Sequence, residues 1–326
     1  MERAFVGIDI GKTNLRVAVS GTTPELKYFV KQPYRRGSPA EMDRQIVGAV
    51  EQAFREAKVP EDSLAGIGMG VPAIVSRDDG TVLYGPDYDF LQGHSITRAL
   101  RQRFGVPILA DVDPVVASWG EQWLGAGRTC RRFALITWGT GVGAGLILDG
   151  RVYEGPNNLF AEFGHSVVSD DDWPCNCGAV GCLDRLASGP GIAEHARRAL
   201  LAGKETVLRN LCGDRPEAVT CPMVFEAAGQ RDLVAIGILE RVGVLFGRLA
   251  SNLVLTIQPE QIVIVGGLAE RAHWVLDTMN KTMREHCWLI FKGFTRCEIV
   301  PSELGDTAGV LGAIRMVQIK GGSAIS

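Results

Sequence analysis

A glycine-threonine turn joins two apolar runs at two places in this chain of 326 residues. In residues 4–21, an apolar run and an alternating run flank the turn at residues 11–13. In residues 132–150, apolar runs again flank a turn, the Gly-Thr-Gly sequence at residues 139–141. An apolar run, a turn and a second apolar run predict a β-hairpin. Two similar hairpins in one chain predict two similar half-folds.

Helical and strand-like patterns alternate along the rest of the chain. Helical spacing of apolar residues occurs at residues 41–58, 95–104 and 233–255. Short apolar runs typical of buried strands occur at residues 66–71, 106–111 and 261–265. This alternation predicts an α/β architecture with mixed sheets. The length is typical of two domains, and the 46% hydrophobic content is enough for a large core.

The charge and hydropathy of the chain exclude several classes of function. The formal net charge is −3 and the charged residues carry both signs, so we expect no nucleic acid among the partners. The longest uncharged apolar stretch, residues 133–148, is shorter than the roughly 20 residues that a bilayer span needs. The first residues show no charged n-region, apolar h-region or cleavage site. We therefore expect a cytoplasmic protein without membrane contact.

Three of the eight cysteines lie close together, at Cys175, Cys177 and Cys182. Eight cysteines are too few for a disulfide scaffold in a chain of this length, and a reducing compartment favours a metal site over a disulfide cluster. A tetrahedral structural zinc needs a fourth ligand, for which His165 is the nearest candidate. The pattern predicts a Cys3His zinc site, and the alternative is three free thiols in a tight turn. We expect ordinary thiols at the five scattered cysteines, which are Cys130, Cys212, Cys221, Cys287 and Cys297.

The two glycine-threonine turns are typical of phosphate-binding backbone. Glycine lets backbone amides approach an anion closely, and the threonine hydroxyl adds a donor. Neither turn has the spacing of a Walker loop, and neither opens a helix after a strand as a dinucleotide-binding loop does. The second turn alone is also compatible with a tightly packed, bulged strand. Together with Asp9, the pair favours nucleotide phosphates bound across a cleft.

Five motifs in order along the chain resemble those of the ROK sugar kinases, a family of the actin-like ATPase superfamily. The first phosphate motif, D-x-G-x-T, is found at residues 9–13, and the second, G-T-G-[IV]-G, at residues 139–143. The sugar-binding motif E-x-G-H corresponds to residues 162–165 and the motif C-x-C-G-x-x-G-C to residues 175–182. A glycine pair on the adenosine side corresponds to residues 266–267. The resemblance covers nearly the whole chain.

The resemblance implies a two-domain actin-like ATPase fold, related to ribonuclease H, with mixed sheets and an interdomain cleft. A small N-terminal α/β domain would span residues 1–116, and a helix at about 307–320 would cross back to complete it. A larger domain with the zinc loop would span residues 117–306. The implied reaction is ATP-dependent phosphorylation of a hexose hydroxyl, at O6, with magnesium. The implied partners are a small-molecule sugar and ATP, and the implied assembly is a homodimer or homotetramer.

The resemblance also assigns roles to residues. Phosphoryl transfer to a hydroxyl calls for a carboxylate that accepts the hydroxyl proton, and the family's N-D-A-N motif places that base at Asp111. The structural alternative for this segment is a helix N-cap, for which Asp113 is the better candidate because Pro114 follows it. The residues implied for ATP and magnesium are Asp9, Gly11, Lys12, Thr13, Gly139, Thr140, Gly141, Gly143, Gly266 and Gly267. The residues implied for the sugar are Ala110, Glu162, His165 and Asp184, and those for zinc are His165, Cys175, Cys177 and Cys182.

Several positions depart from the family pattern and leave the hexose unassigned. Ala110 stands where the family has asparagine, and Asp184 is shorter than the family's glutamate. A site built around particular hydroxyls rejects analogues that leave its polar groups unpaired, so these changes alter sugar choice. Two alternatives stay open: a non-catalytic sugar sensor of the same family, and a kinase that uses polyphosphate. We expect no helix-turn-helix domain ahead of the first strand, and we expect Trp119, Trp123 and Trp138 to lie mostly in the core.

Overall fold

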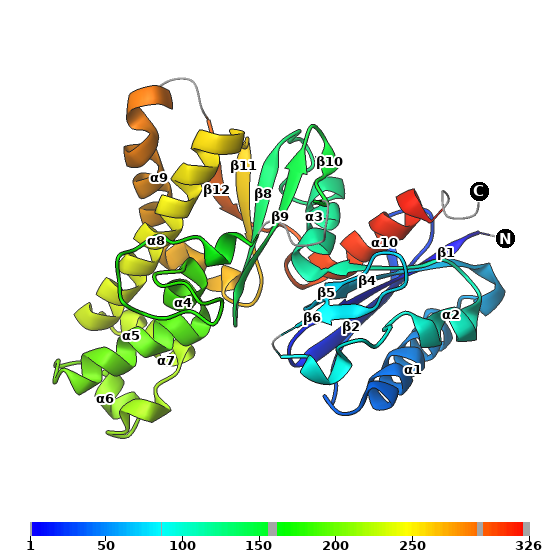
Figure 1. Ribbon diagram of the computed structural model, residues 1–326, viewed down its shortest axis with the longest axis horizontal. Helices are drawn as coiled ribbons and strands as arrows, with labels where there is room; N and C mark the ends of the chain where they lie inside the picture. The colour runs from blue at the N-terminus through cyan, green and yellow to red at the C-terminus, as the bar shows by residue number, and fades with distance from the viewer. Residues whose placement is uncertain (1, 86, 156–161, 292–295, 322–326) are drawn as a thin grey trace.

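The computed structural model describes residues 2–85, 87–155, 162–291 and 296–321, and its framework is a pair of five-stranded sheets (Figure 1). The strand order of the first sheet is β3-β2-β1-β4-β7. Its strands β1, β2 and β3 pair antiparallel, whereas β4 and β7 run parallel to β1. The five strands are β1 (Ala4–Ile10), β2 (Asn14–Ser20), β3 (Leu26–Pro33), β4 (Leu64–Val71) and β7 (Ile108–Val112).

The second sheet repeats the plan of the first. Its order is β10-β9-β8-β11-β12, with β10, β9 and β8 antiparallel and β11 and β12 parallel to β8. The repeated plan confirms the two similar half-folds that the paired hairpins predict, and it is the mixed-sheet α/β fold expected. The five strands are β10 (Arg151–Val152), β9 (Val142–Leu148), β8 (Phe133–Trp138), β11 (Gln261–Val265) and β12 (Glu298–Pro301).

Two helices and a small hairpin accompany the first sheet. Helix α1 (Pro39–Ala57) packs on β2 and β3, and α2 (Arg98–Phe104) packs on α1. Ser38 caps α1, because its side chain accepts a hydrogen bond from the backbone N–H of Glu41. The hairpin consists of β5 (Ile74–Val75) and β6 (Val82–Tyr84). Two 3-10 turns, η1 (Glu61–Ser63) and η2 (Asp89–Leu91), complete this half.

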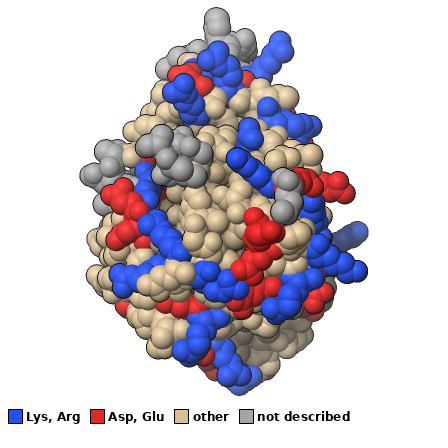
Figure 2. Space-filling model, turned by 90° about the vertical axis from the view of Figure 1, so that its right-hand side faces the viewer, with Lys and Arg blue, Asp and Glu red and all other residues tan. Residues whose placement is uncertain are grey.

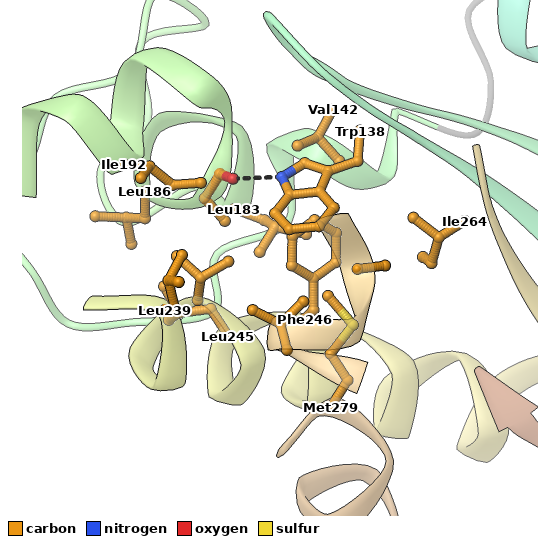
Figure 3. Close-up of a cluster of buried hydrophobic side chains, with 14 of the residues drawn as sticks. Trp138, Val142, Leu183, Leu186, Ile192, Leu239, Leu245, Phe246, Ile264 and Met279 are labelled. Carbon is orange, nitrogen blue, oxygen red and sulfur yellow. Dashed lines mark hydrogen bonds between the residues drawn. The ribbon is translucent and has the colours of Figure 1, made fainter. Parts of the chain in front are cut away.

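The second half is larger because a helical layer covers one face of its sheet. In Figure 3, Trp138 points from β8 toward Phe246, and its Nε1–H donates to the carbonyl oxygen of Ala187 at 2.7 Å. Trp138 is fully buried, as expected of a core tryptophan. In the part of the chain that the structure describes, no helix is both long and apolar enough to cross a bilayer. The helices are α4 (Leu183–Ala187), α5 (Gly189–Leu201), α6 (Leu208–Leu211), α7 (Cys221–Gly229), α8 (Leu233–Ile257) and α9 (Leu276–Phe291), with 3-10 turns η3 (Phe163–His165), η4 (Pro216–Ala218), η5 (Ala269–Trp274) and η6 (Gly305–Thr307).

Helices α3 (Asp113–Trp123) and α10 (Ala308–Lys320) pack against each other between the sheets (Figure 1). Helix α10 lies directly on β4, where a Cβ added to Gly68 would be 1.9 Å from the carbonyl oxygen of Ala313. Such closeness requires glycine. The C-terminal helix therefore packs on the first sheet. The domain boundary expected after residue 116 falls inside α3, and it stays a prediction.

The face of the first half shown in Figure 2 carries both signs of charge. Basic and acidic side chains are interspersed around a central uncharged area. A surface that binds nucleic acid through its phosphates presents a basic stripe instead. The expectation that nucleic acid is not a partner stays a prediction.

Candidate functional site

Two aspartates expected to be functional lie in one row across the first sheet. Asp9 stands opposite Gly70 in the pairing of β1 with β4, and Gly70 stands opposite Asp111 in the pairing of β4 with β7. These strands run parallel, so both carboxylates lie near the carboxyl ends of their strands, where α/β sheets bind ligands. Two strand spacings, about 10 Å, separate their backbones. The two carboxylates can therefore serve two different reacting groups.

Asp9 is held by a cation from the neighbouring strand. Arg16 Nη1 donates to Asp9 Oδ2 at 3.0 Å, and Arg16 Nη2 donates to Asp306 at 2.7 Å. Lys31 Nζ donates to the other carboxylate oxygen of Asp306 at 2.6 Å. Burial raises the pKa of Asp9, against the opposing effect of Arg16. Because Asp306 lies just before α10, this chain of ion pairs joins the first turn to the start of that helix.

Asp113 belongs to the same acidic region and does not cap α3. The N-cap position is Val112, and no side chain makes a capping hydrogen bond there, so the capping alternative is wrong. Burial, and then the negative charges of Asp9 and Glu162, raise the pKa of Asp113 to about 8. A divalent cation relieves such repulsion, and magnesium prefers oxygen ligands. The donor set therefore fits magnesium, with Asp9 and Asp113 as the residues that would hold it or its waters.

The first glycine-threonine turn is tied to two tyrosines and an aspartate. The hydroxyl oxygens of Tyr34 and Tyr88 lie 2.8 and 3.1 Å from the carbonyl oxygen of Gly11 and 2.5 Å from each other, so one hydroxyl donates to the carbonyl oxygen and the other donates to its partner hydroxyl. Lys12 Nζ lies 2.8 Å from Asp87. Burial raises the pKa of both phenols, so both stay protonated donors. The sequence reasoning missed both tyrosines, because a side chain that bonds to a loop far along the chain leaves no local pattern.

The first turn keeps its other expected residues close together. Gly11 N–H donates to the carbonyl oxygen of Asn14 at 2.9 Å, which closes the turn. The side-chain amide of Asn14 donates to the hydroxyl oxygen of Thr13 at 3.0 Å. Thr13 is exposed. The turn is therefore a closed hairpin end with an accessible hydroxyl, as a phosphate-binding turn requires.

The second glycine-threonine turn is supported by a hydrogen bond to Asp184. Gly139 N–H donates to the carbonyl oxygen of Gly141 at 3.0 Å, and Thr140 lies exposed at the tip. The carboxylate of Asp184 accepts a hydrogen bond from the N–H of Val142 at 2.7 Å. Gly143 N–H donates to the hydroxyl oxygen of Thr137 across the hairpin at 2.9 Å. Asp184 therefore supports the turn, in addition to the sugar contact expected of it.

The metal-ligand set expected from spacing converges in space. One donor atom from each of four residues lies within 4.8 Å of the others, and these residues are His165, Cys175, Cys177 and Cys182. Cys177 Sγ and Cys182 Sγ are 3.6 Å apart, far longer than a disulfide bond, and all three cysteines are free. The disulfide alternative is therefore wrong. Three thiols and one imidazole whose donor atoms lie this close together can ligate a structural zinc ion in tetrahedral geometry.

The electrostatics of the cysteine cluster also suit a cation. Burial, then the neighbouring thiols, raise the pKa of Cys182 to about 12, because several thiolates this close repel one another. A zinc ion deprotonates its thiol ligands outright. His165 Nδ1 lies 3.5 Å from Cys175 Sγ, whereas its Nε2 faces away and lies 4.0 Å from Glu162. One ring nitrogen can thus bind metal while the other faces outward.

The residues expected to contact sugar lie in two separate places. Glu162 and His165 lie 4.0 Å apart, and His165 is close enough to Asp184 to act on its pKa. Burial raises the pKa of Asp184, and the charge of His165 opposes that effect. Ala110 is 4% exposed and packs in the core of the first half. Its methyl group offers a substrate no hydrogen bond. A role for Ala110 in sugar binding stays a prediction.

Gly266, the first glycine of the pair in the second half, lines a pocket of about 270 Å³. Gly266 has φ +110° and lies against β8, where an added Cβ would be 2.7 Å from the carbonyl oxygen of Trp138. No atom lies within 4 Å of a Cβ added to Gly267, which therefore borders open space. Around Gly266, the polar lining of the pocket consists of Glu270, His273, Ser302 and Asp306.

Comparison with known proteins identifies the family. The sequence matches the ROK family over residues 5–320. The chain is a member of the ROK family. The glucokinase of Halalkalibacterium halodurans is 30% identical to this ROK protein over 316 residues, which are 95% of this chain and 94% of that one. Family and fold expected from the five motifs are thereby confirmed.

Other relatives of this ROK protein include both kinases and regulators. The ROK family glucokinase of Streptomyces griseus, solved with glucose and AMPPNP, superposes with a TM-score of 0.81 at 28% identity, over 97% of this chain and 99% of that one. A DNA-binding transcriptional dual regulator from Escherichia coli, NagC, is 24% identical over 96% of this chain and 75% of its own length. Family membership alone therefore does not decide between catalysis and regulation.

Proposed function

We propose that this ROK protein transfers the γ-phosphoryl group of ATP to a hexose, at O6, with Asp111 as the general base. The observation that carries the proposal is the row formed by Asp9, Gly70 and Asp111 at the carboxyl edge of the first sheet. Phosphoryl transfer needs magnesium and phosphate oxygens on one side of the reacting centre and a proton acceptor on the other. A separation of about 10 Å leaves room for both.

The nucleotide would lie between the two glycine-threonine turns, with its adenosine in the pocket beside Gly266. Thr13 and Thr140 are exposed on the two turns and offer hydroxyl donors to phosphate oxygens. Magnesium, held by Asp9 and Asp113 or through their waters, would neutralise charge on the transferring phosphate. The acidic region that raises the pKa of Asp113 supports this placement.

The sugar would be held on the zinc side of the cleft. Zinc bound through Nδ1 of His165 would leave Nε2 to face the sugar, and Glu162 would accept hydrogen bonds from hydroxyls. The zinc is structural in this proposal: it fixes the loop that carries these side chains and takes no part in the transfer. The glucokinases among the relatives support a hexose as acceptor.

The test is release of ADP by the purified protein with Mg-ATP and a panel of hexoses, N-acetylhexosamines and ketohexoses. We expect turnover on at least one sugar, and we expect Asp111→Asn to reduce kcat by about 10²- to 10⁴-fold with the fold intact. Asp78→Asn is the matched control, because Asp78 is an exposed carboxylate near the same edge. Normal turnover by a folded Asp111→Asn variant would remove Asp111 from the mechanism.

A non-catalytic sugar sensor is the second candidate. It is favoured by the regulators that occur among the relatives, such as NagC, which is 24% identical to this chain. Binding of a sugar in calorimetry, with no turnover on any sugar of the panel with either ATP or polyphosphate, would support this candidate. Turnover with polyphosphate alone would show that the protein is a kinase whose phosphoryl donor is polyphosphate. The oligomeric state and the cytoplasmic location stay predictions.

A further inference from the structure

Arg77, just beyond β5, holds the Asp111 carboxylate by both oxygens. Its Nε donates to Asp111 Oδ2 at 2.8 Å, and its Nη2 donates to Oδ1 at 3.3 Å. The backbone N–H of Val112 also donates to Oδ1, at 2.8 Å. The Asp111 side chain is only 2% exposed, so these donors take the place of water. In the contacts of the described residues, Oδ2 has one donor, so its second lone pair has no protein donor.

The third contact of Arg77 reaches the other half of the molecule. Its Nη1 donates to the carbonyl oxygen of Glu154 at 2.7 Å, just after β10 of the second sheet. The Glu154 carboxylate is paired with Lys320 at the end of α10. Lys320 also lies 5.8 Å from the centre of the Trp119 ring, on α3. One guanidinium therefore connects the carboxyl edge of the first sheet to the edge of the second.

We propose that Arg77 is a positioning residue for Asp111, a role that rests on the proposed function of Asp111 as general base. The planar fork fixes the plane of the carboxylate, so that Oδ2 presents its open lone pair in one direction. The guanidinium of Arg77 also donates to the carbonyl oxygen of Glu154 in the second half. The orientation of the Asp111 carboxylate therefore depends on the relative position of the two halves of the molecule.

The hydrogen bonds around Asp111 determine what loss of Arg77 does. Without the guanidinium, Oδ2 loses its donor, and Oδ1 keeps only the backbone N–H of Val112. The carboxylate can then turn about its side-chain bond, so Oδ2 no longer keeps one direction toward the reacting hydroxyl. Removing Arg77 should therefore lower kcat more than it changes the binding of ATP.

The experiment measures kcat, KM for ATP and KM for the accepted sugar in Arg77→Ala, Arg77→Lys and the control Arg101→Ala. Arg101 contacts the same loop through the carbonyl oxygen of Asp78 but does not touch Asp111. For Arg77→Ala we expect kcat to fall about 10- to 100-fold and KM for ATP to stay within about twofold. Arg77→Lys should not restore kcat, because an ammonium cannot hold both carboxylate oxygens as the planar guanidinium does.

Each outcome decides between the two proposals. An unchanged or higher kcat in folded Arg77→Ala, a rise in KM for ATP as large as the fall in kcat, or the same changes in Arg101→Ala would overturn the role of Arg77. Full recovery of kcat in Arg77→Lys would overturn the requirement for the fork. If Arg77→Ala does not fold, Arg77→Gln and Arg77→Lys provide the same comparison. Turnover that survives in Asp111→Asn would instead reject the base itself, whereas loss in Asp111→Asn with no effect in Arg77→Ala rejects only the positioning role.

Discussion

The carboxylate of Asp184 accepts a hydrogen bond from the backbone N–H of Val142 at 2.7 Å, and this contact joins the cysteine cluster to the second glycine-threonine turn. Asp184 lies two residues after Cys182, in the first turn of the short helix α4. The segment expected to hold the metal therefore also contacts the backbone expected to bind phosphate. A change in the cysteine cluster should therefore alter phosphate binding at the second glycine-threonine turn.

Asp184→Ala should weaken nucleotide binding. The substitution leaves the Val142 N–H without its acceptor, and loss of a charged hydrogen bond costs about 1.5 to 3 kcal/mol, so we expect KM for ATP to rise about 10-fold or more. Asp184→Asn keeps an acceptor oxygen and should retain most of the affinity for ATP. Asp172→Ala, at an exposed position of the same loop, is the control. Equal ATP affinity in all three variants would show that the contact does not shape the turn.

The cysteine cluster should bind one zinc ion per chain. Elemental analysis of the purified protein should detect this zinc, and Cys177→Ser should lose it with a lower melting temperature, because structural zinc contributes folding free energy. Cys130→Ser, at a thiol far along the chain from the cluster, should keep the metal. Removal of zinc by a chelator should also raise KM for ATP through Asp184. A protein that is purified without zinc and does not bind added zinc would contradict the assignment.

Asp113→Asn should stabilise the fold at neutral and alkaline pH. The pKa of Asp113 rises from its ordinary value of 3.8 to about 8, through burial and then the charge of Asp9. Between these values the folded state binds more protons than the unfolded state, so stability falls as pH rises through this window. Asparagine does not titrate, so the variant avoids this fall in stability. Relative to the unsubstituted protein, we expect its free energy of unfolding to be about 1 to 2 kcal/mol higher at pH 8 without magnesium.

The test for Asp113→Asn is thermal unfolding of both proteins from pH 5 to pH 8 without magnesium. The difference in melting temperature should widen steadily toward pH 8. A difference that stays constant with pH would show that Asp113 does not titrate in this range. Repeating the series with magnesium should narrow the gap, because a cation beside Asp9 and Asp113 stabilises both carboxylates in their charged form.

Gly309→Ala should reduce turnover by displacing Asp9. A Cβ at this position of α10 would lie 2.7 Å from the Asp9 carboxyl carbon, so either the helix or the carboxylate must shift. We expect kcat to fall at least about 10-fold while the protein stays folded. Gly237→Ala is the matched control, since it lies in a helix with no atom within 4 Å of the added Cβ, and alanine there should stabilise the helix slightly. Equal activity of the two variants would show that Asp9 tolerates displacement.

The sequence predicted the parts of this molecule that depend on local pattern. Both hairpins and the long helix expected at 233–255 are present, the helix as α8, because alternation and helical spacing are properties of neighbouring residues. The cysteine cluster was found from spacing for the same reason, since its ligands lie within 18 residues of one another, from His165 to Cys182. The motifs then identified the family and with it the fold.

Contacts between distant segments could not be predicted in this way. Arg77 and Asp111 are 34 residues apart, and Arg77 and Glu154 are 77 residues apart, so neither pair leaves a period in the sequence. The role of Asp113 was misjudged because Pro114 after it resembles a helix start, whereas the acidic surroundings that raise its pKa come from other elements. The short elements β5, β6 and α6 have too few residues for periodicity to appear.

The position of α10 has a consequence for the order in which the molecule is made. The helix packs on β1 and β4, and its backbone lies so close to the first sheet that Gly68 cannot carry a side chain. The half of the protein that is translated first therefore depends on a segment that is translated much later. We expect a nascent chain that ends before residue 308 to leave the face of β1 and β4 uncovered until α10 is made.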